Sequence, residues 1–123
     1  MRCSMLIVAG FTAAAMAAIA VPAYAEYGAF ALEQATGKVG YSWNEANPRQ
    51  AEDVAIKACN ASGCKIVFKV GPKKCGAIAL TDEGKIWGGS DRPTKAAAEL
   101  AAIENCQKRT KLQCKVRSSE CNR

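Results

Sequence analysis

Short apolar runs occur twice along the chain in the same order, each followed by a polar turn. Residues 28–32, with the sequence GAFAL, return as residues 76–80, with the sequence GAIAL, and in both runs larger and smaller side chains alternate. This alternation is typical of a β-strand whose two faces meet different surroundings. Turns that contain Gly37 and Gly84 follow the two runs, so each run is predicted to form a hairpin with the strand after it.

After each hairpin the apolar spacing changes to that of a helix. Asn47 and Thr94 are favourable N-cap residues, and alanines recur three and four positions apart behind both of them. In the first helix the stripe predicted to be buried consists of Ala51, Val54, Ala55, Ala58 and Cys59. In the second helix it consists of Ala98, Leu100, Ala101, Ala102, Ile103 and Cys106. Such small residues let a helix lie close to a sheet.

A further strand is predicted after each helix. Residues 65–70 alternate lysine with apolar side chains, which would turn one face inward, and Val116 repeats this pattern more weakly. The chain is therefore predicted to contain two β-β-α-β repeats, over residues 27–70 and 75–121. The predicted fold class is α+β, with the repeats related by an approximate two-fold axis and both helices packed on antiparallel sheet.

The first 25 residues have a different character from the rest. Arg2 precedes an apolar run over residues 5–21, and Ala23-Tyr24-Ala25 forms a small-x-small cleavage site before Glu26. These features predict a signal peptide, residues 1–25, and one mature domain, residues 26–123, in the periplasm or secreted. An uncleaved membrane anchor is the alternative, although an apolar run of about 17 residues is short for a membrane span. No second such run follows, so no transmembrane segment is expected after cleavage.

Six of the seven cysteines follow the predicted leader, and an even number in an exported chain is typical of a disulfide framework. Equivalent positions in the two repeats should form equivalent bonds. The predicted pairs are Cys59 with Cys64, Cys106 with Cys114, and, by elimination, Cys75 with Cys121. Zinc is the competing use, but the intervals are loose for a zinc site and the chain contains no histidine. No metal and no cofactor are expected.

The formal net charge of +6, or +5 once Arg2 is removed, favours anionic partners. A candidate basic patch consists of Lys69, Lys73, Lys74, Lys108, Arg109, Lys111, Lys115 and Arg117. It could bind an anionic lipid or polymer surface, or it could simply be a solvated rim. No nucleic-acid-binding motif accompanies these charges, so sequence-specific recognition of nucleic acid is not indicated.

Catalytic groups are scarce. Without histidine, and with its cysteines bonded, the chain lacks the usual serine and cysteine hydrolase constellations. A carboxylate-based hydrolase is the remaining enzymatic alternative, and its candidates are Glu52, Glu99, Asp82, Glu83 and Asp91. Acidic residues in helices and turns usually serve local hydrogen bonds or the helix dipole. We therefore expect no enzymatic activity.

A rigid binding or inhibitor module is the favoured hypothesis, with another envelope or extracellular protein as partner. Aromatic and arginine side chains on and just after the second strands are of the types that dominate binding energy at interfaces. The candidate binding surface consists of Tyr41, Trp43, Asn44, Trp87, Asp91 and Arg92. The alternative is that Trp43, and less so Trp87, belongs to the core.

Several of these motifs, taken together, resemble a known family. They run in order from Tyr-Gly-Ala-x-Ala at Tyr27 and Gly-x-x-Gly-Tyr-Ser-Trp at Gly37 to a helix ending in Cys59, Cys-Lys-x-Val at Cys64 and Cys-Gly-Ala-x-Ala at Cys75. This pattern is similar to the bacterial secreted domain of unknown function 4189. The resemblance implies a small exported, disulfide-bonded bacterial protein, and it supplies no reaction or binding residues.

The second repeat departs from that pattern after its hairpin turn. Aligned residue by residue, Trp87 takes the place of Gly40. In the same alignment Gly88, Gly89 and Ser90 replace Tyr41, Ser42 and Trp43. A role that depends on an aromatic at this site would then belong to one repeat only.

Overall fold

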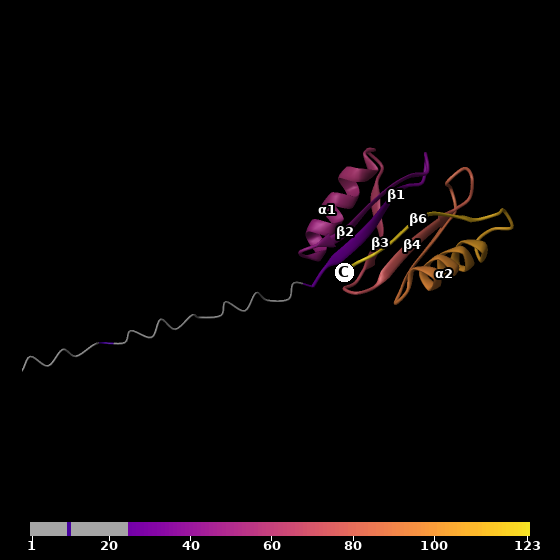
Figure 1. Cartoon of the computed structure of the whole chain (residues 1–123). Coiled ribbons are helices and arrows are strands. Elements are labelled where there is room, and N and C mark those ends of the chain that lie inside the picture. The colour runs from indigo at the N-terminus through magenta and orange to yellow at the C-terminus, as the bar shows by residue number, and fades with distance from the viewer. Residues whose placement is uncertain (1–9, 11–24) are drawn as a thin grey trace, which may run out of the picture.

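The computed structural model describes residue 10 and residues 25–123, so the predicted signal peptide lies almost entirely outside the described residues. The first repeat, which we call copy one, contains β1 (Tyr27–Glu33), β2 (Lys38–Glu45), α1 (Pro48–Cys59) and β3 (Lys65–Val70). The second repeat, copy two, contains β4 (Cys75–Leu80), β5 (Trp87–Arg92), α2 (Lys95–Gln107) and β6 (Lys115–Cys121). The two predicted β-β-α-β repeats and the α+β class are confirmed (Figure 1).

The strands form two antiparallel three-stranded sheets, ordered β2-β1-β3 and β5-β4-β6. The first strand of each copy is central, since it pairs with both of its neighbours. Figure 1 places α1 and α2 on opposite outer sides of the molecule, with the sheets between them. The domain is therefore a four-layer sandwich in which the inner faces of the two sheets form a shared core.

Along β1 and β4, successive side chains point alternately to the helix layer and to the core between the sheets, as predicted. Ala29 and Ala31 pack with α1, whereas Phe30 lies in the core between the sheets. Close packing of the helices also needs glycine on the neighbouring strands. A Cβ atom at Gly40 would collide with the α1 backbone, and one at Gly88 would collide with the α2 backbone. Each helix therefore packs directly on backbone, which its small residues permit.

Aromatic side chains dominate the core between the sheets. Phe30 is fully buried and stacks on Phe68 with ring centroids 4.5 Å apart. Trp43 meets Phe30 edge-on at 5.2 Å, and Trp87 stacks on Phe68 at 6.2 Å. Such pairs add about 0.5–1.5 kcal/mol to the burial of their area. The row of rings thus joins β2, β1, β3 and β5 across both copies.

The helices begin where the sequence predicts. Asn47 Oδ1 accepts a hydrogen bond from the backbone N–H of Gln50 at 2.9 Å, and Thr94 Oγ1 accepts one from Ala97 at 3.2 Å. Their buried stripes are narrower than predicted, with one residue per turn. The buried positions are Ala51, Ala55 and Cys59 in α1 and Ala98, Ala102 and Cys106 in α2.

The wider stripes were wrong at three positions. Val54 is 38% exposed, Leu100 is 59% exposed, and Ala58 is also exposed. Because each helix packs directly on the backbone at Gly40 or Gly88, only the row facing the strand is fully buried. Beside that row, Ile56 and Ile103 are half-buried, and positions farther round the helix remain in solvent.

The predicted single inward face of β3 also needs correction. A register shift against β1 falls between Phe30 and Ala31, which leaves Val67 as an extra residue in β3. Ile66 therefore packs with the α1 layer, while Phe68 lies in the core between the sheets. The bulge, which re-aims side chains along a strand, lets β3 serve both layers.

The alignment of Trp87 with Gly40 was wrong by one residue. Trp87 pairs with Leu80, as Val39 pairs with Leu32, so Val39 is its equivalent. Gly88 then corresponds to Gly40, which agrees with their shared contact to a helix. Copy two therefore has one extra residue between its turn and β5. The extra residue is not obvious in the sequence, because Lys38-Val39 after Gly37 looks like Lys85-Ile86 after Gly84.

Three disulfides join the cysteines in the predicted pairs, Cys59 with Cys64, Cys106 with Cys114 and Cys75 with Cys121. The first two tie each helix to the following strand. The third joins β4 to β6 within the sheet of copy two. In the part of the chain that the structure describes, no helix has the length and apolar character needed to cross a bilayer.

Asn122 connects the two copies through its side chain. Its Oδ1 accepts from the Asn44 N–H at 3.0 Å, and its Nδ2 donates to the carbonyls of Val70 and Gly71 at 3.2 and 2.9 Å. Asn122 is 5% exposed, so these bonds form away from water. This residue, which follows β6, thereby satisfies backbone groups of β2, of the end of β3 and of the connection between the copies.

Candidate functional site

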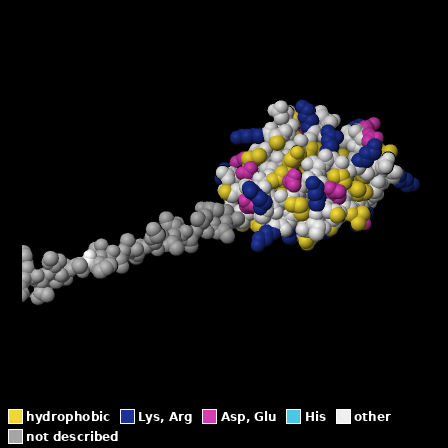
Figure 2. Space-filling model, viewed as in Figure 1, with side chains coloured by type: hydrophobic (Ala, Val, Ile, Leu, Met, Phe, Trp, Pro, Cys, Tyr) yellow, Lys and Arg dark blue, Asp and Glu magenta, His cyan; other side chains and the backbone are white. Residues whose placement is uncertain are grey.

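The predicted basic residues are divided between the two ends of the sheets. Lys65 and Lys115 lie at the hairpin end, because they pair with Leu32 and Leu80 beside the turns. Lys69 and Lys74 lie toward the opposite end. Lys69 pairs with Ala29, three residues along β1 from Leu32 or about 10 Å away, and Lys74 precedes β4. Figure 2 shows Lys and Arg side chains spread among apolar patches and carboxylates on the visible face.

Local ion pairs engage part of this charge. Lys69 pairs with Glu52 at 2.8 Å, Lys74 with Asp91 at 3.8 Å, and Lys115 with Asp82 at 3.6 Å. Lys73 lies in the connection between copies, with a left-handed φ of 58°. Lys108, Arg109 and Lys111 follow α2 at the hairpin end, and Arg117 lies on β6. The eight cations do not form one continuous patch.

The predicted binding surface is likewise divided. Trp87 lies at the hairpin end of β5, while Asp91 and Arg92 lie at the opposite end, where they pair with Gly76 and Cys75. Tyr41, the first candidate on β2, has 45% of its surface exposed to solvent.

Trp43 and Asn44 are used by the scaffold. Trp43 packs against the core between the sheets, and its indole Nε1 is buried without a hydrogen-bond partner among the described residues. Asn44 adopts a left-handed φ of 57°, and its Oδ1 accepts from the Arg123 N–H at 2.8 Å. Trp43 therefore anchors β2 in the core between the sheets, and Asn44 links β2 to the C-terminal residues.

A groove of about 610 Å³ lies at the hairpin end, and we call it groove one. It is enclosed by the end of β1, the turn before β3, the start of β3 and the first residue of β5. Its walls include Leu32, Glu33, Gln34, Lys65, Val67 and Trp87. Both copies contribute, so the groove exists only in the assembled domain.

Glu33 fixes one side of groove one. Its Oε1 accepts from Thr36 Oγ1 at 2.6 Å, and its Oε2 accepts from the Gly63 N–H at 2.7 Å. These hydrogen bonds, with the nearby Lys38 ammonium, hold the pKa of the Glu33 carboxyl below its ordinary value. The carboxylate thereby links the β1–β2 turn to the turn before β3.

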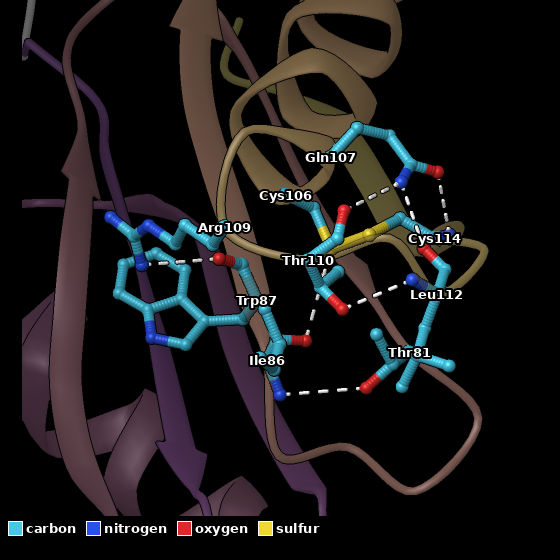
Figure 3. Close-up of a disulfide and its surroundings, with 9 residues drawn as sticks. All are labelled: Thr81, Ile86, Trp87, Cys106, Gln107, Arg109, Thr110, Leu112 and Cys114. Carbon is cyan, nitrogen blue, oxygen red and sulfur yellow. Dashed lines mark hydrogen bonds between the residues drawn. A yellow bond between two sulfur atoms is a disulfide. The ribbon is translucent and has the colours of Figure 1, made fainter.

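Trp87 forms the opposite side, and Arg109 lies over its ring, outside the lining of the groove. The Arg109 guanidinium lies 5.0 Å from the centre of the Trp87 ring, and its Nη1 donates to the Trp87 carbonyl at 3.1 Å. Figure 3 shows this guanidinium over the half-buried indole. One face of Trp87 thus meets Arg109 and the other side of the ring is packed toward Phe68.

The segment that carries Arg109 is held in place by covalent and hydrogen bonds. The Cys106–Cys114 disulfide closes this segment into a loop, and the Gln107 side chain crosses the loop (Figure 3). Gln107 Nε2 donates to the Leu112 carbonyl at 2.8 Å, and its Oε1 accepts from the Cys114 N–H at 2.9 Å. The guanidinium is therefore positioned by a closed loop rather than by a free tail.

An equivalent hollow exists in copy two, which we call groove two. It consists of two neighbouring cavities of about 220 and 210 Å³ that share Thr81 and Asp82. Lys115 takes the place of Lys65, but it is paired with Asp82. Val39 is the equivalent of Trp87 and is not among its lining residues. Groove one is thus the larger, aromatic form of a duplicated feature.

The carboxylates considered for hydrolysis lie apart and have local partners. Glu52 and Glu99 belong to helices on opposite sides, and Glu99 accepts from Ser119 Oγ at 2.5 Å. Glu83 pairs with Lys85 at 3.6 Å. Among residues 25–123, no three histidine, cysteine or acidic side chains gather as metal ligands would.

These features define a class of protein, a small duplicated α+β domain held by three disulfides and hollowed where its copies meet. The chain belongs to the family described as Domain of unknown function (DUF4189), whose model matches residues 27–121. The resemblance seen in the sequence is thereby confirmed.

Relatives with similar sequences come from mycobacteria. The uncharacterised protein Rv1813c of Mycobacterium tuberculosis is 32% identical over 92 residues, which are 75% of this chain and 61% of that protein. Protein Rv1269c of the same organism is 36% identical over 77 residues, or 63% of this chain and 58% of that protein. The chain thus spans about three fifths of the length of these relatives.

A solved structure supports the fold. The NMR structure of Rv1813c matches with a TM-score of 0.59 and 26% sequence identity, covering 99% of both chains. The arrangement of two helices, two sheets and paired copies is therefore shared with a bacterial relative.

Proposed function

We propose that this protein is an exported, non-catalytic binding module of the bacterial envelope that holds a segment of another protein in groove one. The observation that carries the proposal is the Trp87 indole, half-buried in the wall of the groove and braced by Arg109. Tryptophan and arginine are over-represented among the residues that dominate binding energy. A cavity of about 610 Å³ also lies within the usual range of binding sites.

Rigidity supports this role. Binding loses free energy when loops and side chains must be ordered, so a preformed surface binds more tightly. Glu33 joins two of the turns around groove one, and the Cys59–Cys64 disulfide closes the turn that contains Gly63. The Cys106–Cys114 disulfide does the same for the segment with Arg109. The walls of the groove, and the cation that lies over Trp87, are thus preorganised.

Three disulfides within about 100 residues suit an oxidising compartment, which supports export. The pairing of Glu52, Asp82, Glu83 and Asp91 with lysines accounts for these carboxylates without a reaction.

Inhibition of a partner enzyme is one form that binding in groove one could take. Attachment to anionic lipid or polymer is less favoured, because the cations lie at both ends of the sheets.

The test is affinity capture from an envelope extract of a bacterium that encodes this chain. The baits are the exported protein, its Trp87→Ala variant and its Tyr41→Ala variant, whose side chain is exposed elsewhere. We expect a protein captured by the unchanged chain and by Tyr41→Ala to be lost with Trp87→Ala. Circular dichroism checks that each bait is folded. Identical capture by all three baits would show that groove one is not the binding surface.

A further inference from the structure

We infer that the segment bound in groove one is an extended acidic peptide in which an apolar side chain stands beside a carboxylate. This inference rests on the proposed function and adds the chemistry of the partner. Three features of the groove carry it: an apolar floor, unpaired positive charge at the rim, and the contrast with groove two.

The floor offers a contact for one apolar side chain. Leu32 is 2% exposed and forms the base, and Ile66, Val67 and Trp87 are half-buried along the sides. An aliphatic or aromatic side chain placed there would cover apolar surface that now faces water, which stabilises a complex by roughly 25 cal/mol per Å².

The free charge at the rim is positive. Glu33, the only carboxylate of the groove lining, keeps its negative charge, but it accepts two hydrogen bonds and lies near the Lys38 ammonium. Lys65 is exposed and has no ion-pair partner among the described residues, and the same holds for Arg109. Arg109 uses one of its five N–H donors on the Trp87 carbonyl. Lys65 in the groove lining and Arg109 on the Trp87 ring thus offer free donors to a carboxylate.

Groove two has the same backbone frame but a different set of charges. Its lysine, Lys115, pairs with Asp82 at 3.6 Å, and Arg117 is a second cation of its lining. In copy one Gln34 stands where copy two has Asp82, so Lys65 lacks that partner. Of the two equivalent lysines, the unpaired one therefore lies in the groove that also has the tryptophan.

The probe is the capped peptide acetyl-Gly-Ser-Glu-Leu-Glu-Ser-Gly-amide. Two matched peptides replace either both glutamates with glutamine or the leucine with serine. Binding is followed by NMR on the ¹⁵N-labelled protein, purified as the cell exports it with its disulfides formed. Phosphatidylglycerol vesicles form a separate arm, which tests the anionic membrane surface as the alternative occupant.

We expect the acidic leucine peptide to shift the Trp87 indole N–H and the Lys65 amide signals with saturation. The glutamine peptide should bind about tenfold more weakly, and the serine peptide should not saturate, since each lacks one of the two contacts. Lys65→Gln and Arg109→Gln should each weaken binding about threefold to fivefold. Lys115→Gln is the matched control in groove two and should leave the affinity unchanged.

Absence of a saturable shift at millimolar peptide would overturn the inference, as would equal binding of the glutamine peptide. A loss with Lys115→Gln as large as that with Lys65→Gln would also overturn it, because the charge effect would then not belong to groove one. Vesicle binding without any peptide response would reassign the cations to a membrane surface. If Trp87-dependent capture of a partner persists while the acidic peptide fails to compete, only the peptide chemistry is wrong. If capture does not depend on Trp87, the proposed function fails as well.

Discussion

Gly37 and Gly84 touch each other across the internal two-fold axis, at the tips of the two hairpins. A Cβ atom on Gly37 would lie 3.0 Å from the Gly84 Cα, and one on Gly84 would collide with the Gly37 Cα. Both have a left-handed φ, 73° and 72°. The same turn in each copy thus supplies the contact that brings the hairpin ends of the sheets together, next to groove one.

Gly84→Ala should destabilise the domain by about 2–4 kcal/mol. The left-handed backbone costs an L-residue roughly 1–2 kcal/mol, and the added methyl group has no space at the contact with Gly37. Urea unfolding at equilibrium measures the change. Gly71→Ala is the control, since its Cβ would meet only the Lys74 side chain at 3.9 Å. Equal effects of the two substitutions would contradict the role of the turn contact.

The disulfides should differ in their contributions. In the chain-entropy model the Cys75–Cys121 bond, which spans a sequence separation of 46, stabilises by about 4 kcal/mol, and Cys59–Cys64, with a separation of 5, by about 2 kcal/mol. Paired Cys→Ser variants of each bond, unfolded in urea, test the order. A larger loss from the Cys59 and Cys64 pair would be the opposite of what the loop lengths predict.

Asn122→Ala should cost about 2–3 kcal/mol, because it leaves the Asn44 N–H and the Val70 carbonyl without their buried partner. Thermal unfolding followed by circular dichroism gives the shift in midpoint. The exposed Gln113→Ala serves as the comparison and should change stability by less than about 0.5 kcal/mol. A similar small effect at Asn122 would mean that water replaces its hydrogen bonds.

Acid should weaken the domain partly through Glu33. Its pKa in the folded state is lowered, chiefly by the hydrogen bonds from Thr36 and Gly63. A lowered folded-state pKa means that the carboxylate stabilises the fold above its unfolded-state pKa. This contribution is lost as the pH falls through the folded-state value.

The measurement is the urea midpoint of the protein and of Glu33→Gln between neutral pH and pH 3. The advantage of the unchanged protein should shrink as the pH falls. An advantage that stays constant over this range would show that Glu33 does not titrate with folding.

The scaffold could be predicted because its signals are local or repeated. Alternation in residues 28–32 and 76–80 gave the inner strands, and the matched cysteines gave all three bonds. The exposure of Leu100 could not be foreseen, since it depends on how closely α2 approaches Gly88. The way a helix packs on its sheet, rather than the spacing of apolar residues in the sequence, decides how many of its residues are buried.

Groove one was missed for a related reason. Trp87 was a candidate for the binding surface, and Arg109, which lies over it, was a candidate for the basic patch. Glu33 and Lys65 look like ordinary turn and strand-end residues in the sequence. They meet Trp87 only when the copies assemble. The extra residue after Gly84 hid the equivalence of Trp87 with Val39 and so concealed that the two grooves are related.

The two tryptophans of the chain report on different events. Trp43 is half-buried between the sheets, with its indole nitrogen away from water, whereas Trp87 faces groove one beside a cation. Unfolding should therefore red-shift emission from both, while an occupant of the groove should alter Trp87 alone. In a Trp43→Phe variant Trp87 would be the one remaining tryptophan, so its fluorescence would report on groove one with no attached dye.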